Sequence, residues 1–297
     1  MKILVTGGNG FLGSFLCKEL SISNEVFTLS RSNSNYNFNL DFETPILSQK
    51  FDIVIHAAGK AHLVPLNDFD RNNFFLSNIN GTGNLLESLV ISGIPKYFVF
   101  ISSVSVYGLN KGENINEDAP LLADDPYGRS KIQAEIIIKN WCLRNNVICT
   151  ILRLPLLVGP NPPGNLGAMI RGIKNGYYFN IGGGSAKKSM VLASDISKFI
   201  INAAEVGGTY NLTDGKHVTF FELSKCISKK LNRLFVPNLP LFIAFLFARV
   251  GDLMGNNFLF NTNKLIKITS TLTFDDSKAR IAFGWKPKGV LEGFDFF

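Results

Sequence analysis

The stretch KILVTGGNGFLG, residues 2–13, decides the fold because three signals follow one another in a fixed order. An apolar run ends at Thr6, a glycine-rich turn follows, and Phe15, Leu16 and Leu20 continue at helical spacing. The glycines of the turn leave room for a phosphate to approach the first N–H groups of the helix. The stretch therefore predicts a strand, a tight turn and a helix that bind a dinucleotide.

Strands and helices keep alternating over the first half of the chain. Further strands are predicted at residues 25–29, 51–56, 97–101 and 147–152, and helices at 78–92 and from Tyr127 onward. This order predicts an α/β fold, a Rossmann-like doubly wound parallel sheet. Composition shifts at the Pro- and Gly-rich residues 159–164. We therefore expect a dinucleotide-binding domain over residues 1–160, which shares later elements, and a smaller substrate-binding lobe over residues 161–297.

Composition narrows the class of protein. With 46% hydrophobic and 18% charged residues, the 297-residue chain is globular and not disordered. Its net charge of +7 is spread along the chain, so no nucleic-acid partner is expected. The four cysteines lie in apolar segments and no signal peptide is visible, which predicts reduced thiols in a cytoplasmic protein. His56, His62 and His217 have no metal-ligand spacing, so no metal is expected.

The end of the second strand bears on the cofactor. A free ribose 2′-hydroxyl favours an acidic residue there, but the chain has Ser30 and Arg31. An arginine beside hydroxyls suits a 2′-phosphate, which favours NADP over NAD; the alternative is an exposed loop arginine. Asp41 and Phe42 are candidate adenine contacts, although an ordinary turn would also explain them. The small residues 57–59 would let a cofactor lie against the backbone.

Tyr127 and Lys131 form a candidate proton-transfer pair. Four residues apart near the start of a helix, they share one face. A nearby ammonium favours the phenolate and so predicts a lowered pKa for the tyrosine. Alone, such a pair is most often a solvated helix face. Serines at 102, 103 and 105 follow a strand, at the sheet edge where ligands of parallel sheets gather, which makes them partners for this helix.

One strongly apolar segment, residues 239–254, needs its own interpretation. It is interrupted by Arg249 and Asp252 and is too short to span a membrane. The first expectation is a helix packed in the protein. The alternative is an interfacial patch with weak membrane-surface association.

Several motifs together resemble the extended short-chain dehydrogenase/reductase family, within it the NAD-dependent epimerase/dehydratase group that acts on nucleotide sugars. The resemblance runs nearly end to end. It rests on the glycine loop at 6–13, VIHAA at 54–58, Ser102-Ser103 with VYG at 106–108, and YGRSK at 127–131, together with Asn78, Gly159-Pro160 and the closing motifs at 276–280 and 283–285.

The resemblance implies roles for individual residues. Tyr127 would be the acid/base, Lys131 the ribose-binding lysine that lowers its pKa, and Ser103 the hydroxyl that orients the reacting sugar oxygen. Ser105, Asn165 and Lys188 are further substrate-binding candidates, the last two for a diphosphate. A homodimer is common in the family and is expected here. The expected cofactor-binding residues are Gly7, Gly10, Phe11, Leu12, Gly13, Ser30, Arg31, Asp41, Phe42, Ala57, Ala58, Gly59, Asn78, Ser102, Lys131 and Pro155.

Departures from the family pattern refine the expected reaction. Dehydratases of the group carry an Asp-Glu pair where this chain has Val104-Ser105, which argues against dehydration. Ser30-Arg31 in place of an acid favours a reductase that exchanges NADPH over an epimerase that retains NAD. The stretch 153–165 is similar to bacterial enzymes of surface polysaccharide synthesis that act on UDP-linked N-acetylhexosamines.

The leading hypothesis is therefore an enzyme that transfers a hydride at C4 of a UDP-linked hexose or N-acetylhexosamine, as a 4-ketoreductase. Three alternatives stay open at this point: a UDP-hexose 4-epimerase with retained NAD, a sterol-like hydrophobic-alcohol dehydrogenase that uses residues 239–254 as a lid, and a cofactor-binding sensor without chemistry.

Overall fold

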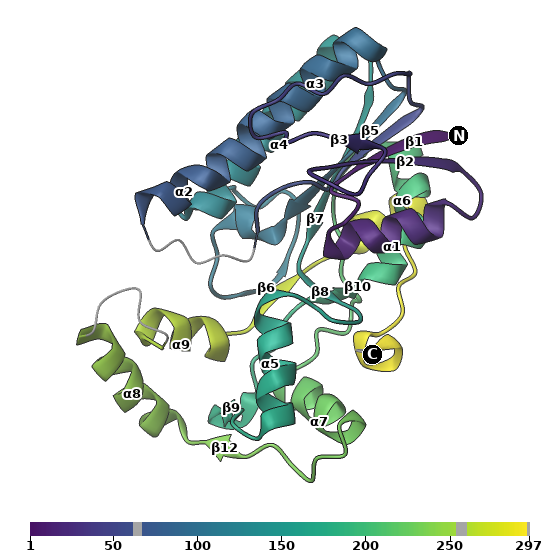
Figure 1. Ribbon diagram of the computed structural model, residues 1–297. Coiled ribbons are helices and arrows are strands. Elements are labelled where there is room, and N and C mark those ends of the chain that lie inside the picture. Colours follow the sequence, from purple (N-terminus) through teal and green to yellow (C-terminus); the bar gives the residue numbers. More distant parts are fainter. Residues whose placement is uncertain (62–66, 254–259, 296–297) are drawn as a thin grey trace.

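The computed structural model describes residues 1–61, 67–253 and 260–295, so His62 and Met254 lie outside it. A seven-stranded parallel sheet in the order β11-β7-β5-β4-β1-β2-β3 forms its centre (Figure 1). The strands of this sheet are β1 (Lys2–Thr6), β2 (Glu25–Ser30), β3 (Tyr36–Asn37), β4 (Ile53–His56), β5 (Tyr97–Ser103), β7 (Ile148–Leu154) and β11 (Gly208–Asn211). Three two-stranded sheets pair β8 (Leu156–Val158) with β10 (Met190–Leu192), β9 (Asn180–Ile181) with β12 (Asn238–Leu239), and β6 (Gly112–Ile115) with β13 (Leu272–Phe274).

Helices connect these strands along the whole chain. The α-helices are α1 (Phe11–Leu20), α2 (Asp68–Phe75), α3 (Gly81–Ser92), α4 (Pro126–Arg144), α5 (Gly164–Asn175), α6 (Ala193–Val206), α7 (Phe220–Lys230), α8 (Leu241–Leu253), α9 (Thr262–Thr269), α10 (Ser277–Phe283) and α11 (Val290–Gly293). A π-helical turn, η1 (Leu76–Asn80), joins α2 to α3. Two short 3₁₀ turns are η2 (Val104–Tyr107) and η3 (Gly182–Gly184).

The strand order reverses beside β1, which confirms the doubly wound sheet. β1 pairs in parallel with β2 on one side and with β4 on the other. The chain leaves β1 through the glycine loop, so this loop stands at the point where α/β sheets bind ligands. Both halves of the sheet therefore deliver their strand ends to the same edge.

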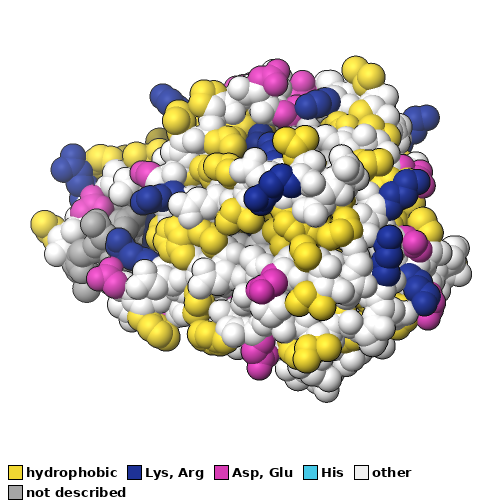
Figure 2. All heavy atoms as spheres, turned by 90° about the horizontal axis from the view of Figure 1, so that it is seen from above, with side chains coloured by type: hydrophobic (Ala, Val, Ile, Leu, Met, Phe, Trp, Pro, Cys, Tyr) yellow, Lys and Arg dark blue, Asp and Glu magenta, His cyan; other side chains and the backbone are white. Residues whose placement is uncertain are grey.

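Helices cover both faces of the sheet (Figure 1). Leu16 of α1 and Ile196 of α6 pack with the strands on one face, and Leu85 of α3 and Ile138 of α4 pack on the other. From above, apolar, basic and acidic side chains are interspersed on the surface (Figure 2). The sheet is thus buried on both sides, as an all-parallel sheet requires.

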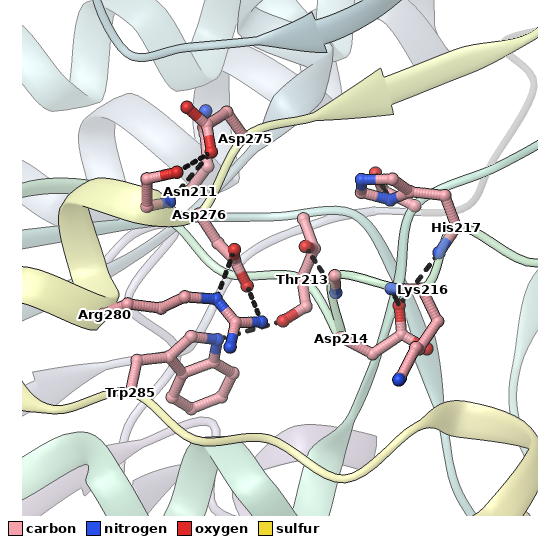
Figure 3. A network of polar contacts seen from close by, with 12 residues as sticks. Asn211, Thr213, Asp214, Lys216, His217, Asp275, Asp276, Arg280 and Trp285 are labelled. Carbon is pink, nitrogen blue, oxygen red and sulfur yellow. Dashed lines mark hydrogen bonds and ion pairs between the residues drawn. The ribbon is translucent and has the colours of Figure 1, made fainter.

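The C-terminal segment returns to the edge of the main sheet (Figure 3). Trp285 is fully buried, and its indole N–H donates to the carbonyl oxygen of Thr213 over 2.9 Å. Asp214, in the same loop after β11, accepts a 2.9 Å hydrogen bond from the backbone N–H of Val290. Arg280 of α10 pairs with Asp276 at 2.8 Å. The second half of the chain therefore supplies α6, β11 and α10 to the dinucleotide-binding part, while the boundary at residue 160 stays a prediction.

Helix α8 corrects the expectation of a packed apolar helix. Only its small residues, Ala244, Ala248 and Gly251, are buried, and the first two pack against Leu265 of α9. Its large apolar side chains are exposed. Within the described ranges no helix is long and apolar enough to cross a membrane.

The features that the sequence did not predict are mainly pairings between strands that lie far apart in the chain. β6 and β13 pair across about 160 residues of chain, and β3 is a two-residue strand without a run of apolar residues. The helix expected at 78–92 begins earlier, at Asp68, because Asn67 caps it by accepting a hydrogen bond from Asp70, and the π turn carries it on into α3. These differences leave the order of the main sheet unchanged.

Gly13 and Gly83 provide a matched test of the close packing at the glycine loop. A Cβ at Gly13 would collide with the carbonyl oxygen of Gly7, whereas a Cβ at Gly83, in α3, would meet nothing within 4 Å. We expect Gly13→Ala to lower the free energy of unfolding by about 1–3 kcal/mol. Gly83→Ala should leave it unchanged or raise it by up to about 1 kcal/mol. Urea unfolding measures both; equal stability of the two variants would refute the packing argument.

Candidate active site

The glycine loop has the shape of a phosphate cradle. A Cβ at Gly7, where φ is +71°, would lie 2.8 Å from the Cα of Ala58. Gly10 precedes α1, and no side chain caps this helix within the part of the chain that is described. The N–H groups of Phe11, Leu12 and Gly13 therefore point out of the helix start without an intrahelical acceptor. These residues fit the diphosphate of a dinucleotide, as the sequence predicts.

A buried histidine, which the sequence analysis left without a role, holds the neighbouring loops together. The Nδ1 of His56 lies 2.7 Å from Oγ1 of Thr6, and its Nε2 lies 3.0 Å from Oγ1 of Thr82 in α3. The hydroxyl of Thr6 also accepts a 3.1 Å hydrogen bond from the N–H of Ala58. Burial, and secondarily the charge of Lys131, lower the pKa of His56 to about 3. A neutral imidazole thus links β1, β4 and α3 beneath the glycine loop.

The loop after β2 is attached to the glycine loop. The Nδ2 of Asn9 donates to the carbonyl oxygen of Ser32 over 2.6 Å. Arg31 is exposed, and the Oγ of Ser30 is buried without a hydrogen-bond partner among the described residues. An exposed guanidinium and an unsatisfied hydroxyl therefore lie beside the cradle, where the sequence predicts the ribose end of the cofactor. Asp41 accepts a 3.0 Å hydrogen bond from Ser77, whereas Phe42 is 71% exposed.

Helix α4 carries the candidate proton-transfer pair, Tyr127 and Lys131, to the edge of the sheet. Asp125 caps it by accepting a 3.0 Å hydrogen bond from the N–H of Gly128, and Pro126 occupies its first turn. Burial raises the pKa of the Tyr127 phenol, and a hydrogen bond with Ser103 opposes that rise only in part. This corrects the lowered pKa that the Tyr-Lys spacing predicts, because desolvation disfavours the phenolate. The phenol is consequently protonated near neutral pH.

Lys131 is directed at the strand end below Tyr127. Its Nζ donates to the carbonyl oxygen of Ile101 over 3.0 Å and lies 4.6 Å from the ring centroid of Phe100. Burial lowers the pKa of this ammonium to about 8. A Cβ at Gly59 would lie 3.3 Å from the same Nζ. The segment next to the glycine loop and helix α4 therefore meet at Lys131.

The π turn contributes Asn78 to the same place. Its Nδ2 donates to the hydroxyl of Ser130 over 2.8 Å, and its Oδ1 accepts a 2.9 Å hydrogen bond from the N–H of Lys60. Ser130 lies between Tyr127 and Lys131 in α4. π turns are frequent at functional sites because they redirect side chains within a helix. Here the turn aims a buried amide at helix α4.

An ion pair that the sequence analysis missed underlies the site. Arg153 of β7 makes two hydrogen bonds with the carboxylate of Glu135, at 3.1 and 2.8 Å, and the side chains are 4% and 1% exposed. Ser102 donates to the same carboxylate over 2.6 Å, so its hydroxyl points below the site and not into it. Glu135 follows Lys131 by four residues, as Lys131 follows Tyr127. That repeated spacing was the available signal.

Some of the remaining predicted site residues lie at the sheet edge, and others lie away from it. Ser103 donates to Ser105 over 3.2 Å, so both hydroxyls stand at the end of β5. Pro155 lies between β7 and β8 at that edge. Asn165 is exposed in the first turn of α5, and the Nζ of Lys188 donates to the carbonyl oxygen of Lys267 over 2.9 Å. The substrate-side candidates are thus spread over the lobe.

Comparison with known proteins identifies the family of this chain. The model of the "NAD dependent epimerase/dehydratase family" matches residues 3–213. The chain is 25% identical to the N-acetyl-alpha-D-glucosaminyl-diphospho-ditrans,octacis-undecaprenol 4-epimerase of Escherichia coli O157:H7, covering 99% of this chain and 93% of that protein. It is 30% identical to the sterol-4-alpha-carboxylate 3-dehydrogenase, decarboxylating, of Dictyostelium discoideum, covering 97% and 96%.

A solved structure shows the same fold. The UDP-glucose 4-epimerase of Thermotoga maritima, determined with UDP-glucose, superimposes with a TM-score of 0.74 at 22% identity over 99% of this chain and 96% of that one. The family match spans both the glycine loop and helix α4. The chain belongs to the NAD-dependent epimerase/dehydratase family and is an enzyme of the short-chain dehydrogenase/reductase type.

Proposed function

We propose that the protein reduces a keto group at C4 of a UDP-linked hexose or N-acetylhexosamine, in surface polysaccharide synthesis. The observation that carries this proposal is the meeting of three parts at one sheet edge: the glycine cradle, Ser103 and the Tyr127–Lys131 pair. The UDP-glucose 4-epimerase of Vibrio cholerae, which is 25% identical over 99% of this chain, supports a UDP-linked sugar as the substrate class. Asn165 and Lys188 are the candidate diphosphate ligands on the lobe.

The chain's own groups account for the proton side of this reaction. A bound nicotinamide supplies the hydride. The phenol of Tyr127 donates its proton to the sugar oxygen, while Ser103 hydrogen-bonds the phenol and positions that oxygen. The raised pKa keeps Tyr127 protonated, which is the form that a reduction consumes. The ammonium of Lys131 lies near the ribose position and would stabilise the phenolate that remains.

The three alternatives differ in what they require. An epimerase needs a retained NAD and a sugar that rotates, and Ser30-Arg31 argues against it. A sterol-like dehydrogenase is a second candidate because the Dictyostelium relative is 30% identical over 97% of the chain. A sensor without chemistry leaves Ser103, Tyr127 and Lys131 unexplained.

We further propose a homodimer that forms through α3 and α4. These helices expose the apolar side chains of Val90, Ile91, Ile136 and Leu143.

Removal of the phenolic hydroxyl tests the assigned chemistry. Tyr127→Phe should lower kcat by about 100- to 10,000-fold, because the proton donor is lost, and leave cofactor affinity nearly unchanged. Tyr177→Phe, at a tyrosine that is 61% exposed, is the matched control and should retain wild-type turnover. Steady-state kinetics with UDP-linked 4-keto sugars and calorimetric titration of the cofactor give both numbers. Full activity of Tyr127→Phe would contradict the assignment.

Cofactor choice is tested at Arg31. Arg31→Ala should lower kcat/KM for NADPH by about 10- to 100-fold, since a charge-assisted hydrogen bond to the 2′-phosphate is lost, and change the value for NADH little. Arg144→Ala, at the far end of α4, removes the same charge and should change neither. An equal effect on both cofactors would show that Arg31 does not contact the 2′-phosphate.

Native mass spectrometry separates the leading function from the epimerase. A reductase should emerge from purification empty or with NADP, whereas a tightly held NAD would favour the epimerase. The same spectrum gives the subunit number, and a monomer would refute the proposed dimer.

Thermal shifts with UDP separate the sugar enzyme from the sterol-like enzyme. UDP should raise the melting temperature of the sugar enzyme only.

A further inference from the structure

The side chains of helix α8 face the opposite way from those of a helix that packs into a core. Its small residues face inward, and its large apolar residues face outward, among them Phe242 at 67% and Leu246 at 63% exposure. The exposed apolar side chains of α8 are Leu241, Phe242, Phe245, Leu246, Phe247, Val250 and Leu253. Leu234 and Phe235, shortly before the helix, are also exposed. An apolar surface of this size on one helix requires a partner.

Basic residues on α8 and on its neighbour α9 indicate the kind of partner. Residues 161–297 contain seventeen Lys and Arg and nine Asp and Glu, so this half of the chain carries a net charge of +8 while residues 1–160 carry −1. Helices α8 and α9 carry the basic residues Arg249, Lys264 and Lys267 and one acidic residue, Asp252. The carboxylate of Asp252 is engaged by Thr262. Apolar side chains beside an excess of Lys and Arg match the interface of an anionic bilayer.

We propose that the outer face of α8, with the basic residues around it, docks on the surface of an anionic lipid bilayer. Figure 1 shows α8 at an outer corner of the lobe, with α9 beside it. The opposite end of the molecule, seen in Figure 2, carries charges of both signs. The docking surface lies on the lobe, and the helix would lie in the interface plane.

The position of this surface connects it to the active site. α8 packs on α9 through Ala244 and Leu265, and the carbonyl oxygen of Lys267 at the end of α9 accepts the hydrogen bond from Lys188. Lys188 is the candidate ligand for the substrate diphosphate, so this step rests on the proposed function. A bilayer under α8 would hold the diphosphate side of the site close to the lipid headgroups.

Vesicle sedimentation tests the docking without reference to turnover. Wild-type protein should sediment with vesicles of phosphatidylcholine and phosphatidylglycerol in equal parts, bind pure phosphatidylcholine vesicles weakly, and lose affinity as salt rises to about 0.5 M. Phe242→Glu/Leu246→Glu should lower the partition coefficient by at least about tenfold. Ile22→Glu/Ile281→Glu, at residues 75% and 86% exposed outside α8, adds the same charge and should bind as wild type.

Each other outcome overturns the proposal. Wild type that stays in the supernatant, or a double variant that binds as wild type, would exclude the docking surface. A change from dimer to monomer in the α8 variant, without vesicle binding by wild type, would assign the surface to a second copy of the chain. Thermal melting checks that the variant is folded, and the milder Phe242→Ser replaces it if it is not. Turnover of a soluble UDP-sugar separates failure of docking from failure of the proposed function.

Discussion

The ion pair between Glu135 and Arg153 is the interaction on which the position of helix α4, and with it of Tyr127 and Lys131, depends. Both side chains are almost completely buried, and Arg153 also donates to the hydroxyl of Tyr107 over 3.0 Å. The loss of one partner would leave an uncompensated charge in the core, which costs about 3–5 kcal/mol. Since Glu135 lies on the same face of α4 as Tyr127 and Lys131, the pair fixes that face against β7. The candidate site is thus anchored to the sheet by a buried ion pair.

Much of the fold was predictable because its signals are local. The glycine loop, the apolar strands and the capped start of α4 are each encoded within about a dozen residues, and the structure contains all of them. Their order then specified the parallel sheet. Tyr127, Lys131 and Ser103 could be proposed together because parallel strands bring their carboxyl ends to one edge.

What the sequence could not reveal depends on distant partners. The pairing of β6 with β13 joins residues far apart in the chain, and no local pattern specifies it. The pKa of Tyr127 follows from the apolar volume around the phenol, which residue spacing does not determine. In α8 the apolar composition was evident, but which side faces outward emerged only when Ala244 and Ala248 were seen against α9. Local motifs specify the features that could be predicted from the sequence. Burial and the identity of distant partners determine the features that could not.

The return of the C-terminal segment to the sheet edge has a consequence for biosynthesis. β11 completes the sheet only after residue 211 has been made, and its following loop is covered by Trp285 and Val290, near the end of the chain. A ribosome adds roughly 5–20 residues per second. After the first 160 residues have been made, several seconds therefore pass before β11 is complete, and more before Trp285 and Val290 are made. During that interval β7 is an unpaired edge strand. The nascent chain therefore has an unpaired sheet edge at β7 until β11 has been made.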